Sequence, residues 1–124
     1  MSSVHDPPCL VHRDAFGRET AYALEQAVVL GRSPEAAVRM DDAAVSWFHC
    51  TVYPLPDDRA GAARTTRWYV ADLGSRNGTW LHGQRITRPA RLRHRDVIQV
   101  GRTHFLVVLL KDDADTPQPA GASG

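Results

Sequence analysis

Apolar positions along this chain fall in short runs that turn residues interrupt. Residues 67–73 show the clearest alternation, with Trp68 and Val70 on the side of the expected strand opposite to their neighbours. The same kind of pattern predicts further strands over residues 27–30, 49–55, 79–81, 97–100 and 103–110. Turn signals recur about every 8–12 residues, a spacing that favours an all-β sandwich or barrel.

Two stretches fit this strand pattern less directly. Ser33-Pro34-Glu35 places a serine cap before a proline, which predicts a short helix that ends near Met40. Residues 19–30 are rich in helix formers, and their periodicity alone does not choose between a helix and strands.

Two turns are predicted at dipeptides that contain glycine. Asn77-Gly78 lies between the strands expected at residues 67–73 and 79–81, and this arrangement predicts a β-hairpin. Gly101-Arg102 is expected to form the turn between the last two strands.

Length and composition are typical of one globular domain. The chain has 124 residues, of which 43% are hydrophobic and 23% charged, so global disorder is excluded. Residues 1–8 are expected to form a flexible lead-in, residues 9–110 the domain, and residues 111–124 a disordered acidic tail. Cys9 and Cys50 are far apart in sequence, which does not suggest a disulfide scaffold.

The charge balance argues against a general polyanion binder. The chain has 15 basic and 14 acidic residues, and 14 of the basic ones are arginine. Arginine presents a fork of donors that suits phosphate and carboxylate groups. Five arginines at positions 85, 88, 91, 93 and 95 are interpreted as part of a solvated loop and edge strand, rather than as a nucleic-acid site.

Three separated motifs combine into a recognisable order. They are Gly31-Arg32, then Ser46 and His49 in a Ser-x-x-His pattern, then a loop that ends at Asn77-Gly78. Together, over about residues 8–110, they resemble the forkhead-associated (FHA) domain family. The resemblance implies an all-β sandwich of two mostly antiparallel sheets with about eleven strands, and it favours strands over a helix for residues 19–30. It also implies that loops at one end bind peptides containing phosphothreonine.

The candidate binding residues supply the chemistry that a phosphate requires. A phosphothreonine carries about two negative charges and three strong acceptor oxygens, so it needs a cation and short neutral donors. By resemblance, Arg32, Ser46 and Ser75 contact the phosphate and Arg76 flanks it. Asn77 is expected to hydrogen-bond the peptide backbone beside the phosphothreonine.

Other residues are expected to shape these loops. By resemblance, His49 supports the loop that presents Ser46. Gly31 and Gly78 are expected to provide the backbone conformation that the loops need. Trp47 stands where the family commonly has a basic residue, and it is a possible contact for the peptide or the neighbouring loop.

No motif supports an enzyme. His94-Arg95-Asp96 mimics a kinase catalytic loop, but Gly101 occupies the position where that loop needs asparagine. The histidines lack close metal-ligand spacing, so we expect neither a metal nor a cofactor.

The sequence therefore predicts a phosphothreonine-dependent protein–protein interaction module in Ser/Thr-kinase signalling. Its partner would be a phosphothreonine-containing protein, such as a kinase or a kinase substrate, with no nucleic acid and no membrane insertion. The alternative is an FHA-fold scaffold that binds partners independently of phosphate. A cytoplasmic location is expected, because no signal peptide is recognised. Thr116 in the tail is a further candidate for phosphorylation.

Overall fold

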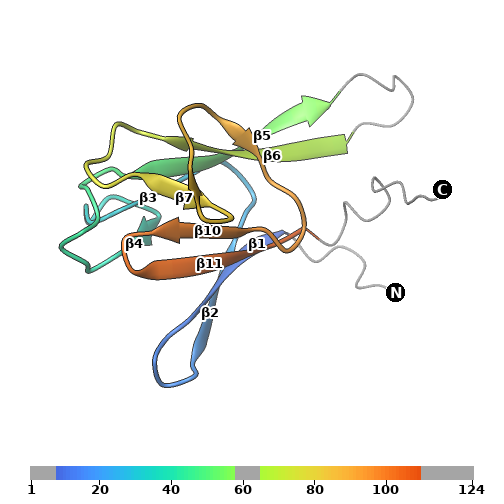
Figure 1. Ribbon diagram of the computed structural model, residues 1–124. Helices are drawn as coiled ribbons and strands as arrows, with labels where there is room; N and C mark the ends of the chain where they lie inside the picture. The colour runs from blue at the N-terminus through green and yellow to red at the C-terminus, as the bar shows by residue number, and fades with distance from the viewer. Residues whose placement is uncertain (1–7, 58–64, 110–124) are drawn as a thin grey trace.

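The strand-forming runs assemble into two β-sheets in the computed structural model, which describes residues 8–57 and 65–109 (Figure 1). The strands are β1 (Cys9–Arg13), β2 (Glu19–Ala23), β3 (Val28–Gly31), β4 (Val38–Arg39), β5 (Cys50–Asp57), β6 (Thr65–Asp72), β7 (Thr79–Leu81), β8 (Gln84–Arg85), β9 (Ala90–Arg91), β10 (Val97–Val100) and β11 (Thr103–Val108). One sheet has the order β2-β1-β11-β10-β7-β8, and the other has the order β4-β3-β5-β6-β9. All neighbouring strands are antiparallel except the parallel pair β3 and β4.

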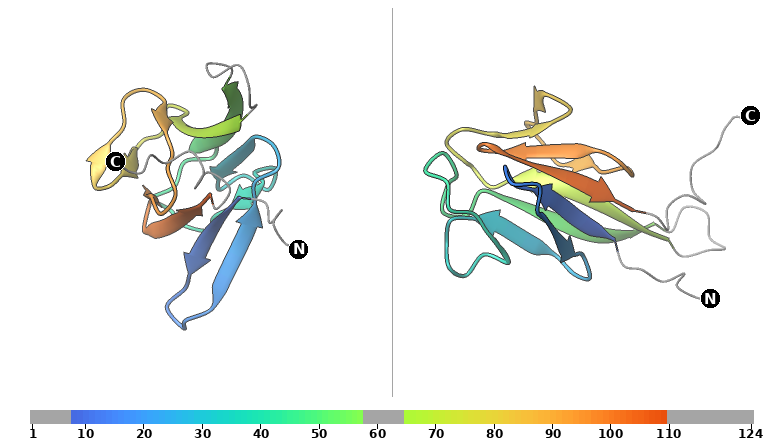
Figure 2. Two further views of the ribbon diagram at one scale, coloured as in Figure 1. Left: turned by 90° about the vertical axis from the view of Figure 1, so that its right-hand side faces the viewer. Right: turned by 90° about the horizontal axis from the view of Figure 1, so that it is seen from below.

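Alternating residues of both sheets form the core between them. Ile98 of β10 and Phe105 of β11 face Val52 of β5 and Val70 of β6, and all four side chains are buried. Alternate positions on these strands are more exposed, as expected for a sandwich with one buried and one solvated face per sheet. The expected all-β sandwich of two mostly antiparallel sheets is confirmed. The β1–β2 hairpin projects beyond it (Figure 2, left).

The short helix expected after Ser33 is wrong. The Ser33 hydroxyl accepts a hydrogen bond from Glu35 N at 3.0 Å, and Ala36 N donates to Ser33 O at 3.0 Å. These bonds close a single turn. The chain then returns to extended backbone, because β4 pairs in parallel with the end of β3. The sequence correctly indicated that Ser33 caps the segment, but the pairing of β4 with β3 limits this segment to a single turn.

The hairpin expected at Asn77-Gly78 is also wrong. Strand β6 belongs to the five-stranded sheet, whereas β7 pairs with β10 and β8 in the other sheet. The 73–78 loop, which contains Asn77-Gly78, therefore carries the chain from one sheet to the other. Gly78 has the positive φ of 89° that favours glycine, in a loop rather than in a two-residue turn.

Other sequence predictions agree with the structure. Strand β2 and most of β3 lie within residues 19–30, and Gly101-Arg102 forms the turn between β10 and β11. The two-residue strands β4, β8 and β9 have no signal in the sequence. The expected lead-in up to residue 7, the tail at residues 111–124 and Thr116 lie outside the described residues.

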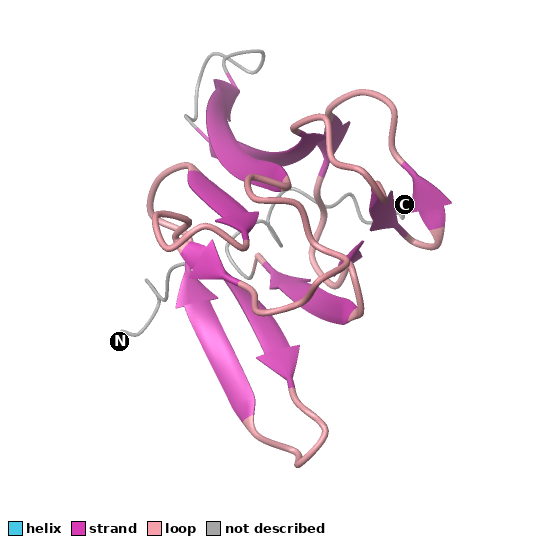
Figure 3. Cartoon of the chain, turned by 90° about the vertical axis from the view of Figure 1, so that its left-hand side faces the viewer, coloured by secondary structure: helices cyan, strands magenta, loops and turns pink. Residues whose placement is uncertain are grey.

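Several connections gather at one end of the sandwich. The β3–β4 and β4–β5 connections, the 73–78 loop and the β10–β11 turn all lie at the left of Figure 1, and Figure 3 views this end face on. We call it the loop end. Among the described residues, none belongs to a helix that is long and apolar enough to cross a lipid bilayer.

Candidate functional site

The end of β3 is docked tightly against residues 45–49 at the loop end. Arg32 N donates to Ser46 O at 3.1 Å, and Ser33 N donates to Trp47 O at 3.1 Å. A β-carbon added to Gly31 would lie only 2.2 Å from Trp47 O. Because no side chain fits there, glycine is what allows the two backbones to approach so closely.

Arg32 is held in place by its own loop neighbours. Its Nε donates to Val45 O at 2.6 Å, and its Cζ lies 5.9 Å from the centroid of the Trp47 ring. Its two terminal amino groups have no partner among residues 8–57 and 65–109. The guanidinium is therefore oriented by internal contacts while the outer part of its donor fork is available to a ligand.

His49 joins this loop to the 73–78 loop. Its ring is fully buried, Ser46 N donates to Nδ1 at 3.0 Å, and Nε2 lies 2.8 Å from Gly78 O. Since Nδ1 accepts from a backbone N–H, the ring proton sits on Nε2 and is donated to the Gly78 carbonyl. The neutral imidazole thus bridges two loops that are distant in sequence.

Asp72 organises the second loop. Its Oδ2 accepts from Gly74 N and Ser75 N, both at 2.9 Å, and its Oδ1 accepts from the hydroxyls of Ser75 at 2.5 Å and Thr79 at 2.7 Å. Burial favours the neutral acid, but these hydrogen bonds, led by the Ser75 hydroxyl, prevail and lower the pKa of Asp72. The carboxylate is thus the centre around which the loop folds.

The two candidate serines differ in what their hydroxyls do. Ser75 is 8% exposed, donates to Asp72, and accepts from Gly78 N at 2.9 Å. Ser46 is partly exposed, and its Oγ accepts from Arg76 N at 3.0 Å. No described residue accepts the Ser46 hydroxyl proton. Ser46 therefore retains a free donor, whereas Ser75 is satisfied within the loop.

Arg76 and Asn77 form the exposed crest of the 73–78 loop. The Asn77 amide Nδ2 donates to Ala44 O at 2.8 Å, which ties the crest to the other loop. Arg76 is exposed, and its backbone N–H contacts the Ser46 hydroxyl. The structure thus brings Arg32, Ser46, Arg76 and Asn77 together at the loop end and places Ser75 beneath them.

A third contact fixes the β10–β11 turn against these loops. Asp42 accepts from Ala44 N at 2.8 Å and from Arg102 N at 2.9 Å. The backbone N–H of Arg102, followed by that of Ala44, lowers the pKa of Asp42. Asp42 and Asp72 were both missed in the sequence. For Asp72 a signal existed, because an aspartate three residues before a serine in a glycine-containing loop is typical of side-chain-capped turns.

Apolar side chains border the site on one side. Trp47 is 52% exposed and Phe48 is 44% exposed, while Leu73 at the start of the second loop is 45% exposed. Leu73 N donates to His49 O at 2.9 Å, which brings its backbone to the Trp47–Phe48 segment. Large exposed apolar groups beside a group of polar residues are typical of a surface that contacts a partner.

The described residues offer little for metal or thiol chemistry. They contain no group of three or more His, Cys, Asp and Glu side chains that could hold a metal ion. Burial raises the pKa of Cys50 to about 12, so this thiol stays protonated at neutral pH.

A comparison with protein families identifies this arrangement. The FHA domain model matches residues 28–101, a range that contains every loop contact described above except the one between Arg102 and Asp42. The chain belongs to the FHA domain family. FHA domains are interaction modules.

Individual relatives agree with this family. The chain is 30% identical over 79 residues to the FHA domain-containing protein FhaB of Mycobacterium tuberculosis, covering 64% of this chain and 45% of that protein. It therefore spans less than half the length of this curated relative. A solved structure from a structural and functional analysis of phosphothreonine-dependent FHA domain interactions superposes with a TM-score of 0.64 at 26% identity, covering 82% of this chain and 95% of the other. Mycobacterium tuberculosis EmbR, solved with a low-affinity phosphopeptide, gives a TM-score of 0.67 at 27% identity, covering 87% of this chain and 26% of EmbR.

Proposed function

We propose that this FHA domain binds phosphothreonine-containing peptides or proteins at its loop end. The observation that carries the proposal is the state of Arg32, whose guanidinium is oriented by Val45 O and Trp47 but keeps its terminal amino groups free. A cation held in this way meets a phosphate without a large further loss of side-chain entropy. Two solved relatives support the same assignment, one from a study of phosphothreonine-dependent FHA domain interactions and the other in complex with a phosphopeptide.

The neighbouring donors complete the proposed phosphate site. The free Ser46 hydroxyl donates to one phosphate oxygen, and Arg76 adds a second positive charge at the rim. Each charge-assisted hydrogen bond contributes roughly 1.5–3 kcal/mol. Two or three of them give a reversible affinity once the cost of association is subtracted.

The other two predicted contacts take different parts in this proposal. Asn77 borders the ligand, and its amide nitrogen also holds Ala44 O, so its side-chain oxygen is the group directed to the peptide backbone. Ser75 acts indirectly, because its hydroxyl is engaged with Asp72 and Gly78. Its part is to fix the loop that carries Arg76 and Asn77.

The proposal also extends to the class of partner and to the place where the partner is met. A phosphothreonine ligand requires a Ser/Thr kinase upstream, so we assign the module to kinase signalling, with the kinase itself or one of its substrates as partner. A cytoplasmic location belongs to the same proposal, since that is where such kinases and their substrates meet.

The test is a binding titration that compares one peptide in three forms: with phosphothreonine, with phosphoserine and with unmodified threonine. We expect saturable binding of the phosphothreonine form and at least about tenfold weaker binding of the unmodified form. Arg32→Ala is expected to weaken phosphothreonine binding by about 10- to 100-fold, because one charge-assisted contact is removed.

The control for this variant is Arg93→Ala. Arg93 is also exposed, but it lies in the β9–β10 connection and not at the loop end. Arg93→Ala should bind as the parent chain does, and thermal unfolding should show that both variants are folded. Equal binding of phosphorylated and unmodified peptides would contradict the proposal and favour the phosphate-independent scaffold.

A further inference from the structure

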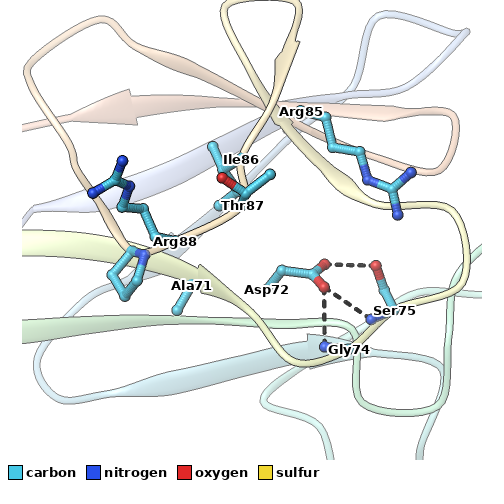
Figure 4. Close-up of a pocket in the computed structure, with 9 residues that line it drawn as sticks. Ala71, Asp72, Gly74, Ser75, Arg85, Ile86, Thr87 and Arg88 are labelled. Atoms are coloured by element: carbon cyan, nitrogen blue, oxygen red, sulfur yellow. Dashed lines mark hydrogen bonds between the residues drawn. The ribbon is translucent and has the colours of Figure 1, made fainter.

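A second concavity adjoins the candidate site. It is a pocket of about 650 Å³ between the 73–78 loop and the segment that follows β8 (Figure 4). Its lining residues are Ala71, Asp72, Gly74, Ser75, Arg85, Ile86, Thr87, Arg88 and Pro89. We call it the Arg85–Arg88 pocket after the two cations on its rim.

The rim of this pocket carries positive charge that the protein itself does not neutralise. Arg85 and Arg88 are both exposed, and neither side chain has a hydrogen bond or an ion pair within the part of the chain that the structure describes. Figure 4 shows their guanidinium groups on either side of the opening. Two cations at one pocket without a paired acid raise the local positive potential and attract an anionic group.

The acid in the lining does not cancel this charge. Asp72 is the lining carboxylate, but its two oxygens already accept four hydrogen bonds from the 73–78 loop and Thr79. Figure 4 shows the Asp72 carboxylate directed to Gly74 and Ser75. The pocket therefore offers the guanidinium groups of Arg85 and Arg88 to a ligand, and the Asp72 carboxylate, whose hydrogen bonds are made within the protein, does not compete for them.

The pocket is continuous with the candidate phosphate site through a single loop. Ser75 lines the pocket, and the next residue, Arg76, donates its backbone N–H to Ser46 of the candidate site. A β-carbon on Gly78 would lie 2.5 Å from Arg85 Nε, so the Arg85 side chain packs over the residue next to Asn77. An extended peptide advances about 3.3 Å per residue, so a ligand that passes Asn77 reaches the pocket within a few residues.

We infer that the Arg85–Arg88 pocket binds a second anionic group on the same ligand, a phosphate or carboxylate borne by a side chain a few residues from the phosphothreonine. This inference rests on the proposed function. The chemistry needed is the bidentate pairing of arginine with a phosphate or carboxylate. Both arginines lie at the surface, so the second group adds a modest, salt-sensitive increment to affinity rather than a separate strong site.

The test uses fluorescence anisotropy with the full chain and a parent phosphothreonine peptide whose flanking residues are uncharged. In one peptide series a single glutamate is moved from about four residues before the phosphothreonine to about four after it. In a second series a phosphoserine is moved through the same positions. We expect one or two neighbouring positions to tighten binding about three- to tenfold.

The variants assign this gain to the pocket. In the double variant Arg85→Gln with Arg88→Gln, the gain should disappear while the parent peptide binds within about twofold of its original affinity. Arg88→Gln alone should remove part of the gain, and it leaves the contact between Arg85 and Gly78 intact. Arg93→Gln, which removes one exposed arginine elsewhere, should keep the whole gain.

The outcomes separate this inference from the proposed function. If the parent phosphothreonine peptide does not bind, the proposed function fails. If it binds but the double variant keeps the gain, or Arg93→Gln loses as much, the inference is overturned. Gain from both series indicates carboxylate or phosphate as the second group, whereas gain from phosphoserine alone restricts it to phosphate. Flat series would overturn the inference, and salt-sensitive DNA binding that the double variant loses would then indicate a nucleic-acid surface.

Discussion

The two loops that meet at the loop end each contribute a serine, and they use it in opposite ways. In the 45–49 segment, Ser46 is partly exposed and keeps its hydroxyl proton free. In the 73–78 loop, Ser75 is 8% exposed and both donates and accepts within the loop. The first serine is available to a ligand, and the second stabilises the surface on which the ligand would rest.

The difference shows that the same residue type can take two roles, one as a contact for a ligand and the other as a scaffold that stabilises the loop. A hydroxyl that is buried must satisfy its hydrogen bonds internally, because an unmet donor costs roughly 1–3 kcal/mol. Ser75 therefore belongs with Asp72 and His49, whose bonds connect segments of the protein. Ser46 belongs with Arg32, which is anchored at one nitrogen and open at the others.

The largest expected effect comes from separating the end of β3 from residues 45–49 at Gly31. Gly31→Ala should lower the free energy of unfolding by about 3 kcal/mol, because its β-carbon meets the Trp47 carbonyl oxygen at 2.2 Å and the backbone must move. Gly74→Ala is the matched control, since its β-carbon meets nothing within 4 Å but its φ of 81° is strained for alanine. That variant should lose only about 1 kcal/mol. Chemical denaturation of both variants checks the order, and a smaller loss for Gly31→Ala would contradict the close docking of β3 against residues 45–49.

Next in size is the scaffold serine. Ser75→Ala should lower the free energy of unfolding by about 2 kcal/mol, because it leaves Gly78 N without an acceptor in a buried position and removes one donor from Asp72. Its effect on phosphothreonine affinity should be smaller than its effect on stability when both are expressed as free energies. Denaturation and peptide titration on the same variant measure the two. A variant as stable as the parent would show that Ser75 is not a scaffold residue.

The same scaffold predicts a loss of stability in acid. The pKa of Asp72 is lowered from its ordinary value of 3.8 on folding, so its stabilising contribution is complete above that value and is lost as the pH falls through the lower folded pKa. The stability difference between the parent and Asp72→Asn should therefore shrink below about pH 4. Urea denaturation from pH 7 to about pH 2.5 measures it. Asp42→Asn is the comparison, because the pKa of Asp42 is lowered too. If the stability difference between the parent and Asp72→Asn stays constant with pH, the Asp72 carboxylate does not stabilise the loop as described.

These contrasts also show how far the sequence reaches. The alternation in residues 67–73 and the motif order predicted the sandwich, because local pattern and core packing agree there. The helix after Ser33 and the hairpin at Asn77-Gly78 failed, because local signals were overridden by pairing with β3 and by the crossing between sheets. The serine cap at Ser33 and the positive φ of Gly78 agree with the local signals, but only tertiary contacts decide where the chain goes next.

Within the candidate site, residue type was predictable and hydrogen-bond state was not. Arg32 and Ser46 follow from motif order alone. That Ser75 points inward follows from Asp72, whose role depends on four donors brought together by folding. The Arg85–Arg88 pocket could not be read from the arginine-rich segment, because it exists only where that segment faces the 73–78 loop.

A smaller effect is expected from the contact serine, and it should fall on affinity. Ser46→Ala should weaken phosphothreonine binding by about tenfold, equal to one hydrogen bond to a charged group. Its free energy of unfolding should fall by less than about 1 kcal/mol, because the Arg76 N–H that it releases lies on an exposed loop. Ser46→Ala should therefore lose more free energy of binding than of unfolding, whereas Ser75→Ala should lose more free energy of unfolding than of binding. Equal ratios for the two serines would abolish the distinction between contact and scaffold.

The smallest effect tests how Arg32 is oriented. The Trp47 ring lies 5.9 Å from the Arg32 guanidinium carbon and is 52% exposed, so this cation–π contact is worth about 0.5–1 kcal/mol. Trp47→Ala should therefore weaken phosphothreonine binding about two- to fivefold, and Trp47→Phe should lose less because it keeps an aromatic face.

Phe48→Ala distinguishes this orienting role from direct apolar contact with the peptide. Phe48 is the next residue and is similarly exposed at 44%. If Trp47 acts through Arg32, Phe48→Ala should bind a phosphothreonine peptide within about twofold of the parent chain, while Trp47→Ala does not. In the Arg32→Ala background, Trp47→Ala should then add no further loss, since the group that it orients is gone. A full additional loss in that background would place Trp47 against the peptide and leave Val45 O as the main anchor of Arg32.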